Sequence, residues 1–247
     1  MARTRGGDGI NRKRGGGATR GRAHRSRQVY VFTEGEVTEP EYIDLIVKNG
    51  TPKKAGETVQ AHIANPNAEG KLRKPLRLVQ DAVKTLRTVE REATDAGLQK
   101  GEHWNWPQVW VLFDRDDHQG IAEAMRLADK EGVHVAYSHP CFELWRLLHY
   151  TNYTSSFGGV CGDANSRLRS SAGFAATYGP GVRTVTEQKS KHVRGDQVLH
   201  EKGDRYRNAK KHAQKINERC ESPDPNKWDP YTDVFAFVED GLLLSGY

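Results

Sequence analysis

Two short apolar runs in this sequence each end in acidic residues, and this pattern constrains the fold more than any other feature. Residues 30–32 precede Glu34, and residues 109–113 precede Asp114 and Asp116. Each run is typical of a strand whose carboxyl end delivers side chains to one edge of a sheet. Carboxylates gathered at one edge repel each other unless a cation lies among them. The pattern therefore predicts a divalent-metal site of oxygen ligands, the kind of site that handles phosphate chemistry.

Strand-like and helical patterns alternate over residues 28–150. Strands are expected near residues 28–32, 58–63, 109–113 and 133–137, and helices near 38–49, 75–96, 120–131 and 138–150. This order predicts an α/β fold with a mostly parallel sheet flanked by helices and right-handed crossovers. The spacing of Thr38 and Glu41 is that of a capping box at the start of the first helix. Residues 151–247 are expected to form a helical C-terminal extension packed against the sheet domain, with a basic helix at 204–218 and a last helix near 230–238.

The composition excludes a membrane span. The chain has 247 residues, of which 36% are hydrophobic and 28% are charged, and no apolar run approaches the roughly 20 residues that a span needs. The basic N-terminus has no apolar segment behind it and is not expected to be a signal peptide. A cytoplasmic location is the expectation.

The cysteines give no pattern of a structural framework. The chain has three cysteines, an odd number, and they are widely spaced: Cys141, Cys161 and Cys220. A disulfide framework or a zinc ribbon is therefore not expected. A reducing compartment is expected instead. Cys141, beside an apolar neighbour, is expected to be a small buried hydrophobic residue.

Residues 1–27 form a basic segment that contains nine arginine or lysine residues and only one acid. The segment is also rich in glycine, so it cannot build a core and is expected to be a disordered arm. One interpretation is an arm that binds the phosphate backbone of nucleic acid, and the other is a solubilising leader. The candidate nucleic-acid contacts are Arg12, Lys13, Arg14, Arg20, Arg22 and Arg25, together with Lys191 and Arg205 nearer the C-terminus.

The acids after the two strands are the candidate catalytic and metal-binding residues. Glu34 precedes Gly35 and is either a ligand or general base, or an ordinary turn glutamate. In an extended chain, Asp114 and Asp116 project to the same side and can reach one ion. Asp117 is a further candidate ligand, although acids here would also suit the start of the next helix.

Four other residues are candidates for a supporting role: His118, His139, Glu143 and Glu39. Glu143 either points back toward the acids or pairs with Arg146, and the sequence leaves both alternatives open. A lone histidine is more often structural than catalytic.

Four motifs in order resemble the RloB family: "VFTEGEVTEPEYI", "VWVLFDRDDH", "VAYSHPCFELWRLLH" and "WDPYTDVFAFV". The resemblance covers most of residues 29–244 and leaves out the basic arm. His139 stands where the family's "SNPCFE" form has asparagine. The resemblance implies a Toprim-like catalytic domain over residues 28–150, in which Glu34 acts as the acid/base while Asp114 and Asp116 hold Mg²⁺ or Mn²⁺.

The resemblance also implies a function. RloB-like proteins are encoded in bacterial defence and abortive-infection loci, often beside an ABC/AAA-type (RloA-like) ATPase. The leading hypothesis is therefore a metal-dependent nuclease that cleaves DNA or RNA, with tRNA among the candidate substrates, as the effector of such a pair. A second hypothesis is a non-catalytic nucleic-acid-binding or regulatory subunit of an ATPase complex, and a third is a phosphatase or nucleotide-processing enzyme. The sequence leaves the number of metal ions and any homo-oligomer open.

Overall fold

The computed structural model describes residues 26–116, 118–199 and 204–247. The arginine and lysine candidates of the basic arm, and Asp117, therefore lie outside the described residues. Ser26 and Arg27, which were expected to belong to the arm, lie in the first strand.

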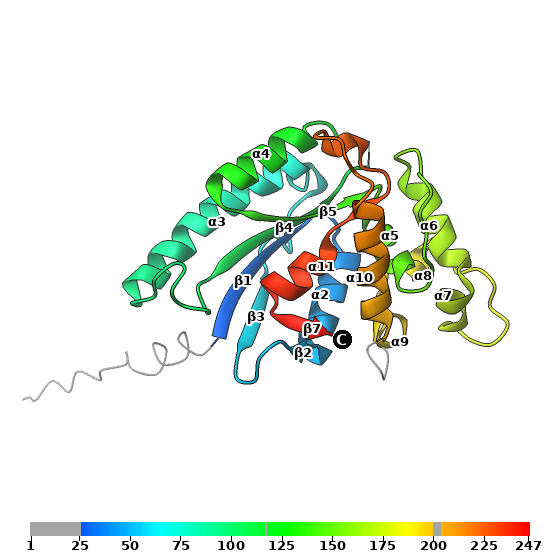
Figure 1. Ribbon diagram of the computed structural model, residues 1–247, viewed down its shortest axis with the longest axis horizontal. Helices are drawn as coiled ribbons and strands as arrows, with labels where there is room; N and C mark the ends of the chain where they lie inside the picture. Colours follow the sequence, from blue (N-terminus) through cyan, green and yellow to red (C-terminus); the bar gives the residue numbers. More distant parts are fainter. Residues whose placement is uncertain (1–25, 117, 200–203) are drawn as a thin grey trace, which may run out of the picture.

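A five-stranded sheet in the order β3-β1-β4-β5-β6 forms the centre of the molecule (Figure 1). Four neighbouring strands are parallel, and β6 pairs antiparallel with β5 at one edge. The prediction of an α/β fold with a mostly parallel sheet is confirmed. The strands are β1 (Ser26–Thr33), β3 (Thr58–Ile63), β4 (Gln108–Asp114), β5 (His134–His139) and β6 (Tyr231–Thr232).

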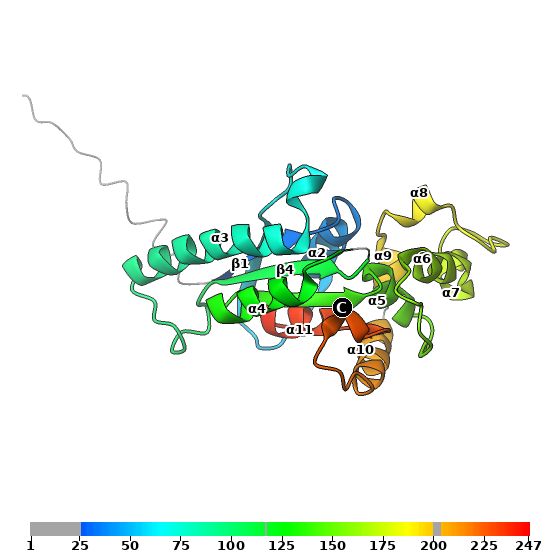
Figure 2. The same cartoon turned by 90° about the horizontal axis from the view of Figure 1, so that it is seen from above.

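Both faces of the sheet are covered by helices, which explains why the central strands read as nearly continuous apolar runs. Alternate residues of β4 face opposite ways: Val109 and Val111 pack in one hydrophobic cluster, and Trp110 and Leu112 in the other. The first cluster includes α3 (Pro75–Asp95) and α4 (Ile121–Glu131). The second includes α2 (Thr38–Asn49), α5 (Phe142–Leu148) and α10 (Asp204–Asn217). Seen from above, α3 and α4 lie side by side over the sheet (Figure 2).

Short elements complete the chain. Helices α6 and α7 lie beyond α5 at one end of the molecule (Figure 2). A small two-stranded ribbon pairs β2 with β7 near the C-terminus. The bounds are β2 (Thr51–Pro52), η1 (Gly70–Leu72), α6 (Cys161–Ser170), α7 (Ala172–Ala176), α8 (Glu187–Ser190), α9 (Gly195–Val198), η2 (Pro225–Lys227), α11 (Val234–Ala236), η3 (Phe237–Gly241) and β7 (Leu244–Gly246).

A buried polar network ties the C-terminal residue to the core. The hydroxyls of Tyr42 and Tyr247 are 2.5 Å apart, and Trp145 Nε1 donates to the Tyr42 hydroxyl at 2.7 Å. His149 Nε2 lies 3.0 Å from the Tyr247 hydroxyl. Because these groups satisfy one another inside the core, the network links α2, α5 and the C-terminus at little desolvation cost.

Two local predictions are wrong. Thr38 and Glu41 form no capping box: the Thr38 hydroxyl donates to the carbonyl of Lys191, and the Glu41 carboxylate accepts from Val193 N. Residues 138–139 belong to β5, and the helix starts only at Phe142, after the cis bond before Pro140. The C-terminal segment is mostly helical, as expected, and in addition contributes β6 to the central sheet.

Candidate functional site

A buried arginine and an asparagine fix the carboxyl end of β1. The side-chain amide of Asn65 bonds both backbone groups of Thr33, at 3.0 Å to its N–H and 2.8 Å to its carbonyl. Arg73 is 4% exposed, and its guanidinium donates to the carbonyls of Thr33, Gly35 and Asn65. The turn that carries Glu34 is therefore held by side chains from the 65–73 loop. Sequence reasoning missed both residues.

Glu34 lies directly against the end of β4. Its backbone N–H donates to the carbonyl of Leu112 at 3.0 Å, which continues the pairing of β1 with β4. Its carboxylate then accepts from Asp114 N at 2.9 Å through Oε2 and contacts His118 Nε2 at 2.5 Å through Oε1. The sequence prediction that Glu34 and Asp114 meet at one edge of the sheet is confirmed.

Asp114, the last residue of β4, reaches across to the start of α5. Its Oδ2 accepts a hydrogen bond from Phe142 N at 3.0 Å. Burial raises the pKa of Asp114 well above its usual range, and the negative charges of Glu34, Glu39 and Glu143 raise it further. A carboxyl group in this setting either takes up a proton and becomes neutral or keeps its charge beside a cation.

Glu39 and Glu143 complete the group. Glu39, in the first turn of α2, is 5% exposed, and its Oε1 accepts from Gly35 N at 2.9 Å. Burial, followed by the charges of Glu143 and Glu34, raises the pKa of Glu39 to about 7. Glu143 influences both of the other acids and makes no hydrogen bond with Arg146, whose guanidinium donates to Ser190 O and Gln197 Oε1. Its charge acts on Asp114 and Glu39 and also on the Arg146 guanidinium, so both alternatives for Glu143 stay open.

We call Glu34, Glu39, Asp114 and Glu143 the acid cluster. Each member lies at the end of β1 or β4 or in the first turn of α2 or α5. These are the carboxyl edge of the sheet and the amino ends of two helices, where anions are favoured. Two members were expected as main ligands and two only as supporting residues.

The remaining acids after β4 are placed differently from the expectation. Asp116 is exposed and has a φ of 31°, so the chain there is not extended, and its N–H donates to Pro140 O. Asp114 and Asp116 therefore do not project together from one strand. His118 lies beside Glu34 instead, and the hydrogen bond with that carboxylate is the main reason that its pKa is raised.

The other candidates lie away from the acid cluster or are already engaged. His139 is buried at the end of β5, and burial lowers its pKa. Arg205 donates to the carbonyl of Asp196 and stacks over the Tyr150 ring at 5.0 Å. Lys191 is exposed, and its ammonium lies 3.9 Å from Glu187.

The donor set fits a hard divalent cation, because every member of the acid cluster offers carboxylate oxygens. Burial, followed by the charges of the neighbouring acids, raises the pKa values of Asp114 and Glu39, and a bound cation would offset that cost. The four carboxylates do not converge on a single point. Among the described residues, the group of His, Cys, Asp or Glu ligand atoms that lie within 4.8 Å of one another is Cys141, Glu143 and Cys161. Shared ligation by the acid cluster would require side-chain rotation.

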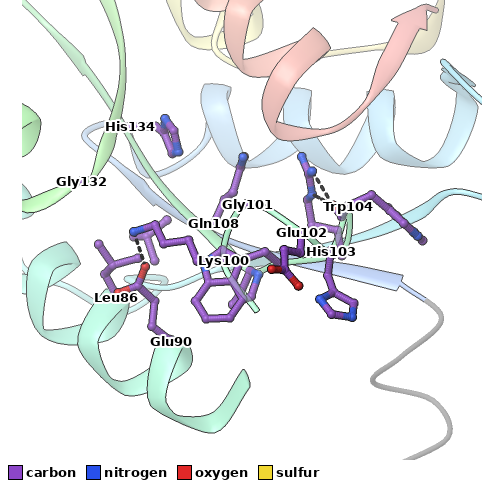
Figure 3. Close-up of a pocket in the computed structure, with 14 residues that line it drawn as sticks. Leu86, Glu90, Lys100, Gly101, Glu102, His103, Trp104, Gln108, Gly132 and His134 are labelled. Atoms are coloured by element: carbon purple, nitrogen blue, oxygen red, sulfur yellow. Dashed lines mark hydrogen bonds and ion pairs between the residues drawn. The ribbon is translucent and has the colours of Figure 1, made fainter. Parts of the chain in front are cut away.

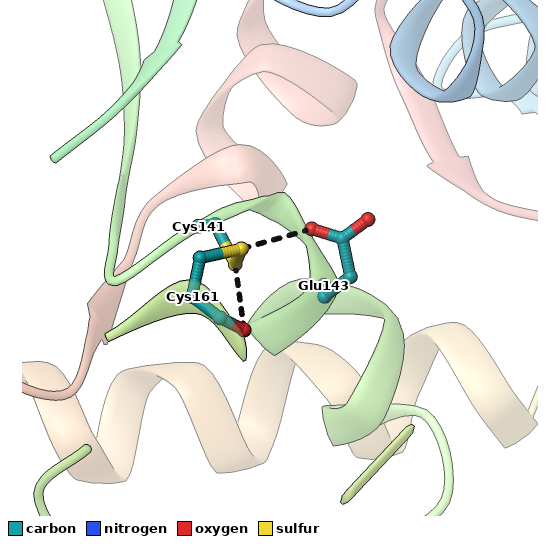
Figure 4. A group of neighbouring side chains, drawn as sticks. All are labelled: Cys141, Glu143 and Cys161. Atoms are coloured by element: carbon teal, nitrogen blue, oxygen red, sulfur yellow. Dashed lines mark hydrogen bonds between the residues drawn. A yellow bond between two sulfur atoms is a disulfide. The ribbon is translucent and has the colours of Figure 1, made fainter. Parts of the chain in front are cut away.

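Cys141 and Cys161 form a disulfide, with 5.4 Å between their Cα atoms (Figure 4). The expectation of no disulfide is therefore wrong for this pair. Twenty residues separate the two cysteines in sequence, and only the packing of α6 against α5 brings them together. Cys141 is nevertheless 2% exposed, as expected for a small buried residue.

A cavity of about 580 Å³ opens at the opposite edge of the sheet, near the amino ends of β1, β4 and β5 (Figure 3). Its charged side chains are largely paired. Lys100 lies 2.7 Å from Glu90, and Arg27 donates to the carbonyl of Trp104. The cavity is lined by none of the acid cluster, and we assign it no role in the chemistry.

Within the part of the chain that the structure describes, no helix combines the length and apolar character needed to cross a membrane. The molecule is an α/β protein with a group of buried and half-buried carboxylates at the carboxyl edge of its sheet. A model of the RloB-like protein family matches residues 29–240, and the chain belongs to this family. Comparison with curated proteins and with solved structures gave no match.

Proposed function

We propose that this protein is a metal-dependent nuclease that hydrolyses phosphodiester bonds of DNA or RNA, with Mg²⁺ or Mn²⁺ held at the acid cluster. The observation that carries the proposal is the set of four carboxylates that includes Asp114, whose pKa is raised by burial and by the charges of the other three. A divalent cation would relieve that repulsion, polarise a phosphoryl oxygen and lower the pKa of a bound water.

The residues have distinct roles in this proposal. Asp114 and Glu143 would contribute ligand oxygens, with Glu39 beside them. Glu34 would serve as the acid/base, because His118 contacts one of its oxygens and a proton could pass between the two groups. We assign Asp116 a lesser role than the family resemblance implies, since it is exposed and lies past a turn.

Family membership supports the biological setting of the proposal. We propose an effector of bacterial antiphage defence or abortive infection that works with an ABC/AAA-type ATPase, and tRNA belongs among the substrates to be tested. The basic arm would supply non-specific affinity for nucleic acid. We further propose a cytoplasmic location.

The test combines metal binding with cleavage. Wild type, Glu34→Gln, Asp114→Asn and Asp116→Asn are titrated with Mn²⁺ by calorimetry and incubated with plasmid, single-stranded DNA and total tRNA. Asp44→Asn is the matched control, because Asp44 lies on α2 with Glu39 but pairs with Lys48 at the surface. We expect Asp114→Asn and Glu34→Gln to abolish cleavage and Asp44→Asn to retain it.

The outcomes separate the hypotheses. Absence of Mn²⁺ and Mg²⁺ binding by wild type would overturn the proposal. Metal binding with no cleavage, even with the partner ATPase and ATP, would favour the non-catalytic subunit. Hydrolysis of free nucleotides but not of polynucleotides would favour a nucleotide-processing enzyme.

A further inference from the structure

The disulfide and the acid cluster meet at the start of α5. Cys141 immediately precedes this helix, Phe142 donates its N–H to Asp114, and Glu143 lies in the first turn. Cys161, the first residue of α6, brings its sulfur 3.7 Å from Glu143 Oε2 (Figure 4). Three consecutive residues, 141–143, therefore connect a cysteine pair to two carboxylates.

We propose that Cys141 and Cys161 are a reversible redox pair whose oxidation holds the start of α5 in the geometry that the acid cluster needs for metal binding. This inference rests on the proposed function, because it concerns the regulation of the same site.

The physical link has two parts. The bond fixes α5 to α6 beside the Phe142 amide, and this amide is the hydrogen-bond donor that positions Asp114. In addition, neither sulfur of a disulfide carries a proton, so the 3.7 Å approach leaves Glu143 Oε2 free to ligate. After reduction, the Cys161 thiol can donate a weak hydrogen bond to that oxygen and compete with the metal.

The two sulfurs differ in access, which sets the order of the chemistry. Cys141 is 2% exposed, whereas Cys161 is half-buried and therefore more open to a soluble disulfide. The Cys161 thiolate attacks a low-molecular-weight disulfide such as glutathione disulfide, which forms a mixed disulfide and releases one glutathione thiolate. The Cys141 thiolate then attacks the Cys161 sulfur and releases the second glutathione. The protein loses two protons and two electrons, and glutathione disulfide is reduced to two glutathione molecules.

The experiment compares the full-length protein after equilibration with glutathione disulfide and after reduction, with free reagents removed anaerobically. Alkylation and mass spectrometry identify the oxidised cysteines. Hydrogen exchange of the peptide 138–150 is measured without metal, and Mn²⁺ affinity is measured by calorimetry. We expect exchange about tenfold slower in the oxidised form and Mn²⁺ affinity about tenfold higher.

Cys161→Ser should lose both redox responses and match the reduced protein, and Cys220→Ser, which leaves the pair intact, should retain them. Circular dichroism confirms that each variant is folded. Equal exchange in both redox states, or equal Mn²⁺ affinity, would overturn the redox role, as would Zn²⁺ retained by the pair in the reduced protein. Hydrogen exchange needs no metal, so it tests the redox proposal on its own. Failure of the nuclease proposal gives a different result, in which Mn²⁺ binds in neither redox state.

Discussion

The backbone N–H of Asp114 donates to Oε2 of Glu34 at 2.9 Å. Eighty residues separate these two in the chain, yet the parallel pairing of β1 with β4 brings the ends of both strands to one place. The other oxygen of Glu34 contacts His118 Nε2 at 2.5 Å. One carboxylate thus links the end of β1, the end of β4 and the loop that follows it.

This arrangement predicts that Glu34→Gln changes the titration of His118. The hydrogen bond with the Glu34 carboxylate is the largest cause of the raised pKa of His118. An amide carries no negative charge, so the pKa of His118 should fall toward its ordinary value. The measurement is an NMR titration of the histidine ring protons, with Asp44→Asn as the control that leaves His118 unchanged. An unaltered His118 titration in Glu34→Gln would contradict the contact.

The raised pKa of Glu39 predicts how the stability of the protein depends on pH. This pKa is raised from 4.5 to about 7, so the folded protein holds a proton that the unfolded chain releases over this range. The associated stability is fully present below pH 4.5 and is lost as the pH rises through about 7. Without divalent metal, the free energy of unfolding should therefore fall on the order of 2 kcal/mol between about pH 5 and 8.

Urea denaturation across this pH range measures the effect. Glu39→Gln cannot titrate and should show a flatter profile, whereas Asp44→Asn should keep the wild-type slope. A profile for Glu39→Gln as steep as that of wild type would assign the loss of stability to another group.

The acids that follow strands could be predicted from sequence because strand and acid are adjacent there. An apolar run and the residues after it fix both the element and the edge at which Glu34 and Asp114 lie. Glu39 and Glu143 could be placed only as supporting residues. Their part in the acid cluster depends on where the first turns of α2 and α5 lie in space, and periodicity does not specify this.

The missed features depend on contacts distant in sequence or on elements too short to form a pattern. Strand β6 has two residues, so no alternation could reveal it. The Cys141–Cys161 bond depends on the packing of α6 against α5. Asp116 was expected to extend from the strand, but a positive φ turns the chain before it can do so.

Replacement of Arg73, which lies outside the acid cluster, is expected to cause a large loss of stability. Its buried guanidinium satisfies the backbone carbonyls of Thr33, Gly35 and Asn65. Arg73→Met would leave these acceptors without donors and should lower the free energy of unfolding by about 3 kcal/mol. The control is Arg77→Met, because Arg77 pairs with Asp81 on the exposed face of α3 and should cost less than about 0.5 kcal/mol. Equal effects of the two substitutions in chemical denaturation would refute the structural role of Arg73.

Replacement of Gly35 by alanine is expected to weaken metal binding selectively. A Cβ atom at this position would collide with the carboxylate of Glu39, which accepts a hydrogen bond from the Gly35 N–H. Gly35→Ala should therefore displace Glu39 and lower Mn²⁺ affinity about tenfold. Gly70→Ala is the matched control, because an added Cβ there meets no atom within 4 Å. Calorimetry on both folded variants makes the comparison. Wild-type Mn²⁺ affinity in Gly35→Ala would show that Glu39 lies outside the metal site and would restrict the proposed ligands to Asp114 and Glu143.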